Sequence, residues 1–289
     1  MIKELVVISG KGGTGKTSLM AAFASLVKDK VVCDADVDAA DLHLIMSPRI
    51  IERHDFVSGN TAHIAPDRCT QCGLCIDVCQ WHAISEAFVV DEIECEGCGV
   101  CYYLCAEKAI DFPPSTCGEW FLSETRFGPM AHARLGIAEE NSGKLVSLIR
   151  REGKKLAEEK GLNLLLTDGP PGIGCPVIAS LGGATAVLIV AEPTVSGRHD
   201  MERVLQLSEF FKIPAMVCIN KFDLNPAQAL AIETYAQEHN AAPMGRIPFD
   251  PVFTKAMVQG QTIFEYDGSS PGAAATKEIW ENLTQHLEI

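Results

Sequence analysis

Eight of the twelve cysteines lie in two copies of one spacing, C-x-x-C-x-x-C-x-x-x-C. The first copy reads RCTQCGLCIDVCQWHAI, and the second, 26 residues later, reads ECEGCGVCYYLCAEKAI. In this spacing three thiolates bind one iron–sulfur cluster and the fourth reaches the other cluster. The spacing therefore predicts two [4Fe-4S] clusters, one held by Cys69, Cys72, Cys75 and Cys105 and the other by Cys79, Cys95, Cys98 and Cys101.

This segment of about 50 residues resembles a bacterial two-cluster ferredoxin over its whole length. It departs from that pattern at Gln80 and Ala106, where proline usually follows the fourth cysteine, and this leaves the cluster potentials less predictable. A structural zinc site is the main alternative. Zinc needs only four ligands, however, and would not account for two ordered quartets with identical spacing.

A second chemical motif stands near the start of the chain, where GKGGTGKT from Gly10 to Thr17 satisfies G-x-x-x-x-G-K-[ST]. Backbone amides of such a loop cradle phosphate groups. The residues expected to bind nucleotide here are Gly12, Gly13, Thr14, Gly15, Lys16 and Thr17. Lys16 is expected to contact the β and γ phosphates, and the Thr17 hydroxyl is expected to coordinate Mg²⁺.

Short apolar runs that could position this loop recur along the chain, each bounded by Gly, Pro or acidic residues and separated by segments of helix length. The predicted strands are Leu5–Ser9, Val31–Asp34, Leu162–Asp168, Ala186–Ala191 and Ala215–Asn220. Because the runs are continuously apolar, they predict a mostly parallel sheet covered on both faces, as in doubly wound α/β folds. Two of the covering helices are predicted at Thr17–Lys28 and Gly143–Lys160.

The cysteine repeats interrupt this alternation of predicted strands and helices, and the interruption predicts two domains. Residues 1–61 and 112–289 are expected to form a discontinuous P-loop domain, and residues 62–111 an inserted small α+β domain. The insert contains nine carboxylates against Arg68 and Lys108, so it carries half of the chain's formal charge of −14. An acidic surface of this kind could dock a protein redox partner.

Composition limits the class of protein. The chain has 289 residues with 47% hydrophobic composition, which is enough for a substantial core. The net charge disfavours a nucleic-acid binder. The amino terminus lacks the features of a signal peptide, no apolar stretch approaches a membrane span, and the last segment, TKEIWENLTQHLEI, predicts a solvated amphipathic helix. We therefore expect a cytoplasmic protein without a membrane anchor, whose reduced thiols bind metal.

Lys11 makes the phosphate loop resemble that of the deviant Walker A family, which includes MinD, ParA, Mrp-type carriers and the nitrogenase iron protein. Two further segments match this family, CDADVDAADLHL as switch I and LLLTDGPPGIG as the Walker B strand running into switch II. The resemblance implies an ATPase that forms a nucleotide-dependent homodimer, in which Lys11 reaches the partner's phosphates. It also implies that Asp36 orients the attacking water and that Asp168 lies near Mg²⁺.

The same resemblance places Asn220, in the sequence INKFD, against the purine base, with Asp223 nearby. These letters also match the guanine-specific N-K-x-D of GTPases, so the motif alone leaves the base open. The Lys11 signature and the segment IPFDP, from Ile247 to Pro251, resemble the ATP-binding members and favour ATP.

The remaining acids and cysteines have plainer interpretations. Asp34 is expected to support the end of its strand, and Asp38 and Asp41 to cap a helix. Cys33 and Cys218 are expected to be core residues.

The sequence leaves open the roles of two cysteines and of one segment. The roles of Cys117 and Cys175 are undecided, although Cys175 follows the Asp168 strand where the nitrogenase iron protein carries a cluster ligand. The segment CGEWFLSETRFGPMAHARLG contains Gly128, Pro129, His132 and Arg134 and is expected to be a surface loop.

Three functions follow from these motifs. The first is an ATPase whose dimer switch gates electron transfer through the two clusters. The second is a carrier that delivers metal or iron–sulfur clusters during maturation of a target. The third is a spatial or partner-binding switch of the MinD type, with clusters that sense redox state or act as structural staples.

Overall fold

The computed structural model describes residues 2–136 and 142–288, which fall into two compact units. The larger unit contains residues 2–53, 120–134 and 142–288, and the smaller unit contains residues 54–119 and 135–136. The chain leaves the larger unit along β3 (Arg49–Asn60) and returns along β6 (Pro114–Thr125). The smaller unit is wider than the cysteine segment 62–111 because it includes the ends of both strands.

The larger unit is built on a sheet with strand order β11-β10-β9-β1-β8-β2-β7-β6-β3. Its further strands are β1 (Lys3–Ser9), β2 (Lys30–Asp34), β7 (Gly128–Leu135), β8 (Leu164–Pro171), β9 (Ala186–Ala191), β10 (Ala215–Asn220) and β11 (Ala242–Ile247). Every neighbouring pair from β11 to β7 is parallel. The predicted α/β fold with a mostly parallel sheet is therefore confirmed.

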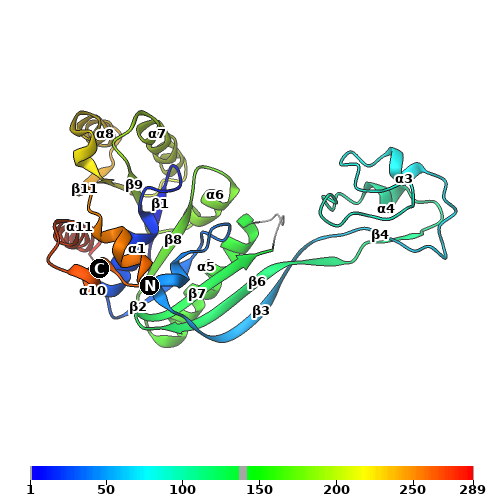
Figure 1. Ribbon diagram of the computed structural model, residues 1–289, viewed down its shortest axis with the longest axis horizontal. Helices are drawn as coiled ribbons and strands as arrows, with labels where there is room; N and C mark the ends of the chain where they lie inside the picture. The colour runs from blue at the N-terminus through cyan, green and yellow to red at the C-terminus, as the bar shows by residue number, and fades with distance from the viewer. Residues whose placement is uncertain (1, 137–141, 289) are drawn as a thin grey trace. The chain divides into compact units, whose positions relative to one another are not determined.

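Helices cover both faces of this sheet (Figure 1). They are α1 (Lys16–Leu26), α2 (Leu42–Met46), α5 (Ser142–Lys160), α6 (Cys175–Leu181), α7 (Val195–Phe210), α8 (Pro226–Glu238), α9 (Val252–Val258), α10 (Ile263–Asp267) and α11 (Pro271–Leu287), with a 3₁₀ turn at Phe222–Leu224. Leu5 and Val7 of β1 pack in one core cluster with α1 and α11, whereas Val6 and Ile8 pack in another with α6, α7 and α8. Successive strand residues point to opposite faces, so both sets must be apolar, and this accounts for the continuous apolar runs.

The carboxyl ends of the parallel strands position the polar residues discussed below. The phosphate loop follows β1, Asp34 ends β2, Asp168 lies within β8, and Asn220 ends β10. In open α/β sheets ligands bind at this edge.

The segment 117–136 corrects an expectation, because it forms most of β6 and all of β7 and is not a surface loop. Ser123 and His132 are both buried, and the Ser123 hydroxyl lies 2.9 Å from His132 Nε2. The His132 ring stacks on Phe121 at a centroid distance of 5.0 Å. These contacts let polar residues sit inside the sheet.

The smaller unit contains little regular structure. Its elements are the antiparallel pair β4 (His63–Ile64) and β5 (Ile110–Asp111) and the short helices α3 (Leu74–Asp77) and α4 (Val100–Leu104). Arg68 bonds to the backbone oxygen of Lys108 at 2.7 Å and pairs with Asp111 at 2.5 Å, which ties the first repeat to the end of the second.

Across residues 2–136 and 142–288, no helix is both long and apolar enough to cross a membrane. The predicted terminal helix is present as α11, but it is not fully solvated, because Ile279, Trp280 and Leu283 lie in the core.

Candidate functional site

The phosphate loop joins β1 to α1 and depends on glycine at two positions. Gly13 and Gly15 have φ angles of 82° and 89°, in the left-handed region that favours glycine. A Cβ atom on Gly15 would lie 2.4 Å from Asn220 Nδ2, so this residue must also be small. No side chain caps the first turn of α1, whose backbone amides are therefore suited to an anion.

Lys16 is the charged centre of the site. Its ammonium lies 2.7 Å from Asp168 Oδ1 and 3.1 Å from Asp36 Oδ2, and all three residues are buried. Burial alone would lower the pKa of Lys16, but the carboxylates of Asp168 and Asp36 outweigh that effect and raise it. The structure thus brings together three residues that the sequence placed far apart along the chain.

Asp34 is a fourth member that the sequence assigned only to strand support. It lies beside Asp168 across the β2–β8 pair and is fully buried. Burial, reinforced by the Asp168 carboxylate, raises the pKa of Asp34, and burial also raises the pKa of Asp36 against the opposing effect of Lys16. Four ionisable groups, three of them acidic, therefore share one buried space.

Several buried oxygen atoms at this edge have no hydrogen-bond partner among the described residues: Asp34 Oδ2, Asp168 Oδ2, Thr14 Oγ1 and Asn220 Oδ1. Buried polar atoms normally have partners, so such a cluster fits a site that takes a polar ligand. Carboxylate and hydroxyl oxygens suit Mg²⁺, and Thr17, half-buried in the first turn of α1, adds a hydroxyl. The residues present therefore fit a nucleotide with Mg²⁺.

Lys11 does not join the Lys16 cluster. Its ammonium lies 3.3 Å from Glu192 Oε2 and 3.4 Å from Ser196 Oγ, and Glu192 Oε1 also accepts a bond of 2.5 Å from Lys221. Sequence analysis missed Glu192, although its place directly after the β9 strand, at the ligand-binding edge, was a usable signal.

Asn220 and Asp223 make contacts with two different segments. Asn220 Nδ2 donates to the Thr14 carbonyl at 2.7 Å, which commits one of its two N–H groups to the phosphate loop. Asp223 Oδ1 accepts from the Phe249 amide at 2.6 Å, inside the segment IPFDP. Asp223 therefore shapes this loop.

The two cysteine repeats adopt matching backbones. Gln71 and Gly73 in the first repeat and Gly97 and Gly99 in the second all have positive φ angles at equivalent positions. His82 and Lys108, three residues after the fourth cysteine of each repeat, also match. The repetition seen in the sequence is thus a repetition of conformation.

Two backbone hydrogen bonds each join the segment before one repeat to the segment after the other. The Ala65 amide, before the first repeat, donates to the Ala109 carbonyl after the second at 2.7 Å. The Asp91 amide, before the second repeat, donates to the Ala83 carbonyl after the first, also at 2.7 Å. Such a crossed arrangement brings the end of one repeat to the start of the other, as sharing of the fourth cysteine requires.

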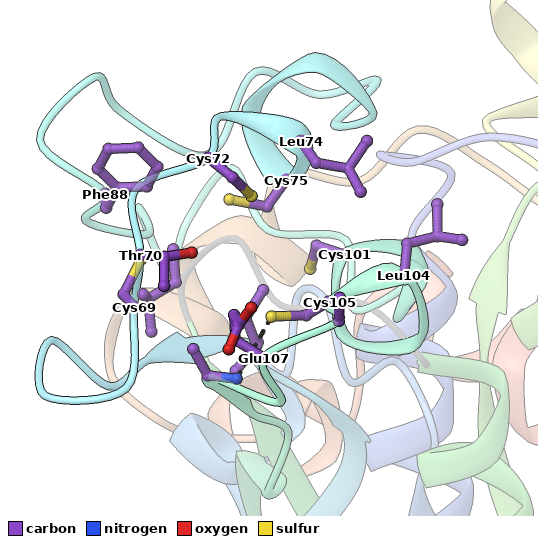
Figure 2. A pocket seen from close by; sticks show the side chains of 14 residues that line it. Cys69, Thr70, Cys72, Leu74, Cys75, Phe88, Cys101, Leu104, Cys105 and Glu107 are labelled. Atoms are coloured by element: carbon purple, nitrogen blue, oxygen red, sulfur yellow. Dashed lines mark hydrogen bonds between the residues drawn. The ribbon is translucent and has the colours of Figure 1, made fainter.

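Figure 2 shows the pocket in which thiols of the two repeats meet. The pocket has a volume of about 150 Å³, and the predicted quartet Cys69, Cys72, Cys75 and Cys105 lines it. Most of the other lining is apolar and includes Ile64, Leu74, Phe88, Leu104 and Ile110. The Ala109 amide donates to Cys105 Sγ at 3.3 Å, an N–H···S contact of the kind that tunes cluster potentials.

Cys101 of the second quartet lines the same pocket, and its electrostatic neighbours are Cys95 and Cys98 of its own quartet and Cys75 of the first. Cys79 stands in the first repeat where Cys105 stands in the second. Among the described residues, no three His, Cys, Asp or Glu side chains are arranged to hold a single metal ion. A zinc centre would need its sulfurs about 2.3 Å from one ion. The first quartet shares the lining of one pocket of about 150 Å³.

The remaining cysteines separate by location. Cys33 and Cys218 are buried in the larger unit, as predicted. Cys117 is buried in β6, where its thiol donates to the Ser58 carbonyl at 2.6 Å. Cys175 is exposed at the first position of α6.

Comparison with known proteins places these features in context. The pattern of the family described as "CobQ/CobB/MinD/ParA nucleotide binding domain" matches residues 5–263. An uncharacterized protein of Methanocaldococcus jannaschii, MJ0578, is 31% identical over 99% of this chain and 98% of its own length.

Among solved structures, the cell division ATPase MinD of Pyrococcus furiosus aligns with a TM-score of 0.60 at 18% identity, covering 99% of this chain and all of its own. The septum site-determining protein MinD of Pyrococcus horikoshii, solved with Mg-ADP, aligns with a TM-score of 0.59 at 16% identity and covers 99% and 97% of the two chains. At these identities the likeness concerns the fold.

Proposed function

Because the chain belongs to the CobQ/CobB/MinD/ParA nucleotide-binding family and is a P-loop ATPase, we propose that its ATP cycle gates electron transfer through two [4Fe-4S] clusters. The observation that carries this proposal is the meeting of Cys69, Cys72 and Cys75 with Cys105 around one pocket. Residues 62–111 would form the inserted ferredoxin-like domain, and residues 1–61 with 112–289 the ATPase domain.

On the nucleotide side, the phosphates compete with two carboxylates for Lys16. In the described structure Lys16 is neutralised by Asp36 and Asp168. When Lys16 turns to the β and γ phosphates, Asp36 is free to orient the attacking water, and Asp168 with Thr17 would hold Mg²⁺. Positioning and charge neutralisation of this kind supply most of the catalysis in phosphoryl transfer.

The hydrogen bonds of Asn220 fit adenine as the base. Its Nδ2 is bound to Thr14, while its buried Oδ1 has no partner within the described chain. A free acceptor matches the exocyclic amino group of adenine. The free acceptor of Asn220 supports ATP as the substrate. Asp223 holds the neighbouring loop through the Phe249 amide.

The dimer switch would depend on Lys11. This lysine is about one third exposed and lies outside the Lys16 cluster, so it is available for a partner subunit's phosphates. A shift from one state to the other requires that ATP bind the dimer better than the separate subunits. A homodimer that closes on ATP and opens after hydrolysis meets this condition.

The cysteine quartets would hold the clusters, which supply one-electron storage and transfer when bound. The chain's own contribution is the apolar lining of the pocket and the Ala109 amide on Cys105, which set the dielectric and charge around the thiolates. The formal charge of −7 on residues 62–111 favours a redox partner with a basic docking face.

An anaerobic redox titration of the reconstituted protein, followed by EPR with and without MgATP, tests the proposal. We expect the midpoint potential of at least one cluster to shift when MgATP binds. The control is Lys16→Ala, in which MgATP should cause no shift. Failure to assemble clusters would refute the iron–sulfur role, and assembled clusters with unchanged potentials would favour a metal carrier or a partner-binding switch.

A further inference from the structure

Glu192 forms an ion pair with Lys11, and the proposed function gives it no role. It follows β9 and is largely buried, with a side-chain exposure of 14%. One carboxylate oxygen faces Lys11 at 3.3 Å and the other faces Lys221 at 2.5 Å. A single carboxylate thus neutralises two lysines that border the phosphate loop.

Lys221 extends this link to the loop itself. Its ammonium also donates to the Gly13 carbonyl at 3.1 Å, so Glu192 is connected through Lys221 to the backbone that should cradle phosphates. Lys221 has a φ angle of 60°, an unfavourable conformation for a residue other than glycine. Strain of this kind persists where surrounding contacts require it and is concentrated at functional positions.

The start of α7 holds Lys11 from the other side. Ser196 Oγ lies 3.4 Å from the Lys11 ammonium, and Thr194 caps the helix by accepting from the Gly197 amide at 2.9 Å. A Cβ atom on Gly197 would lie 2.5 Å from the Glu192 carbonyl, so the backbone packs closely beside Glu192. The contact between Lys11 and Glu192 is therefore made by well-supported elements within one subunit.

We propose that Glu192 is a positioning residue that holds Lys11 against its own subunit until ATP phosphates displace it. The proposal rests on the proposed function in one respect, namely that Lys11 acts across a dimer. A lysine paired with Glu192 cannot at the same time extend to a partner's nucleotide. Phosphates arriving beside Lys221 and Gly13 add negative charge next to Glu192, which weakens its hold on both lysines.

Chemical labelling of lysines in the nucleotide-free holoprotein tests the Lys11–Glu192 contact directly. The protein is treated briefly with an amine-acetylating reagent, and the modification of Lys11 is measured by mass spectrometry relative to exposed Lys277 on α11. We expect Glu192→Gln, which keeps the side-chain shape and removes the charge, to raise Lys11 labelling at least threefold. Glu202→Gln, whose carboxylate pairs with Arg198 on α7, is the matched control and should leave it unchanged.

A second measurement needs no variant. The Lys11–Glu192 pair is partly exposed, so salt should screen it, and Lys11 labelling in the wild-type chain should rise towards the Glu192→Gln value at ~1 M salt, where the Debye length is about 3 Å. Labelling that is unchanged in Glu192→Gln and independent of salt would overturn the proposal, whatever the protein's oligomeric state.

The ATP dependence of dimerisation tests the functional consequence of the Lys11–Glu192 contact. Sedimentation at increasing MgATP should show that Glu192→Gln dimerises at about a threefold to fivefold lower ATP concentration, the range expected for one partly exposed ion pair. An unchanged threshold together with raised labelling would overturn the claim that the contact restrains dimerisation. If neither protein dimerises at any ATP concentration, the dimer switch under the proposed function fails, and the Lys11–Glu192 contact is judged by labelling alone.

Discussion

At the scale of single residues, alanine substitutions at Gly13 and Gly15 distinguish the cost of a left-handed backbone from the cost of a steric clash. Both have positive φ angles, but a Cβ atom on Gly13 meets nothing within 4 Å, whereas one on Gly15 meets Asn220 at 2.4 Å. We expect Gly13→Ala to lower the free energy of unfolding by about 1 kcal/mol, the cost of a left-handed residue. Gly15→Ala should cost at least about 1 kcal/mol more. Urea unfolding measures both, and equal losses would contradict the predicted clash.

The residue scale also shows what one sequence can and cannot reveal. Lys16 and the cysteine quartets could be assigned from the sequence because each belongs to a motif with fixed spacing and known chemistry, and the cluster-binding role of the quartets stays a prediction. Glu192 and Asp34 were not, because each is a single acidic residue at a strand end whose importance depends on which strands are neighbours. The order of the strands in the sheet is a property of the fold, and the spacing of residues along the sequence does not reveal it.

At the scale of elements, the β6–β7 pair gives stability a dependence on pH. Burial, with a smaller contribution from His43, lowers the pKa of His132 from 6.5 to about 4. Between these values the unfolded chain binds a proton that the folded chain does not, so stability falls as pH decreases from about 6.5 to 4. We expect His132→Gln, which keeps a hydrogen-bonding group for Ser123, to remove roughly 2 kcal/mol of that decline. Urea unfolding at pH 7 and pH 5 measures it, and an equal decline in both proteins would contradict the assignment.

The paired repeats lead to a prediction about their fourth cysteines. Because the ends of the repeats exchange partners, Cys105→Ser should remove the cluster of the first repeat and Cys79→Ser that of the second. Each variant should keep about half of the wild-type iron after reconstitution. Cys218→Ser, which changes a buried core cysteine of the larger unit, is the control. If Cys105→Ser instead removed only the cluster of its own repeat, as judged against a Cys98→Ser reference by EPR, the crossed assignment would be wrong.

The same elements explain why the sheet was predicted incompletely. The strands that were found, such as β9 and β10, are apolar on both faces and short, which distinguishes them from loops. β6 contains Ser123 and β7 contains His132, and these polar residues are accommodated by a specific contact with each other that local composition does not reveal. β3 is largely exposed along most of its length and therefore lacked an apolar signal.

At the scale of the whole molecule, coupling between nucleotide and clusters must be reciprocal. If MgATP changes the midpoint potential of a one-electron cluster by 59 mV, reduction of that cluster must change ATP affinity about tenfold. We expect the dissociation constant of a non-hydrolysable ATP analogue to differ between oxidised and reduced protein by the factor that the measured potential shift dictates.

The variant Lys11→Ala identifies the route of this coupling. Lys11 lies outside the buried Lys16 cluster, so its loss should leave nucleotide binding to a single subunit largely intact while preventing the closed dimer. If coupling passes through dimer closure, the potential shift and the affinity ratio should disappear together in this variant. If both persist, the nucleotide acts on the clusters within one subunit and the dimer is not the gate. Titration calorimetry on oxidised and reduced protein, paired with the redox titration, separates these outcomes because both experiments measure the same coupling free energy.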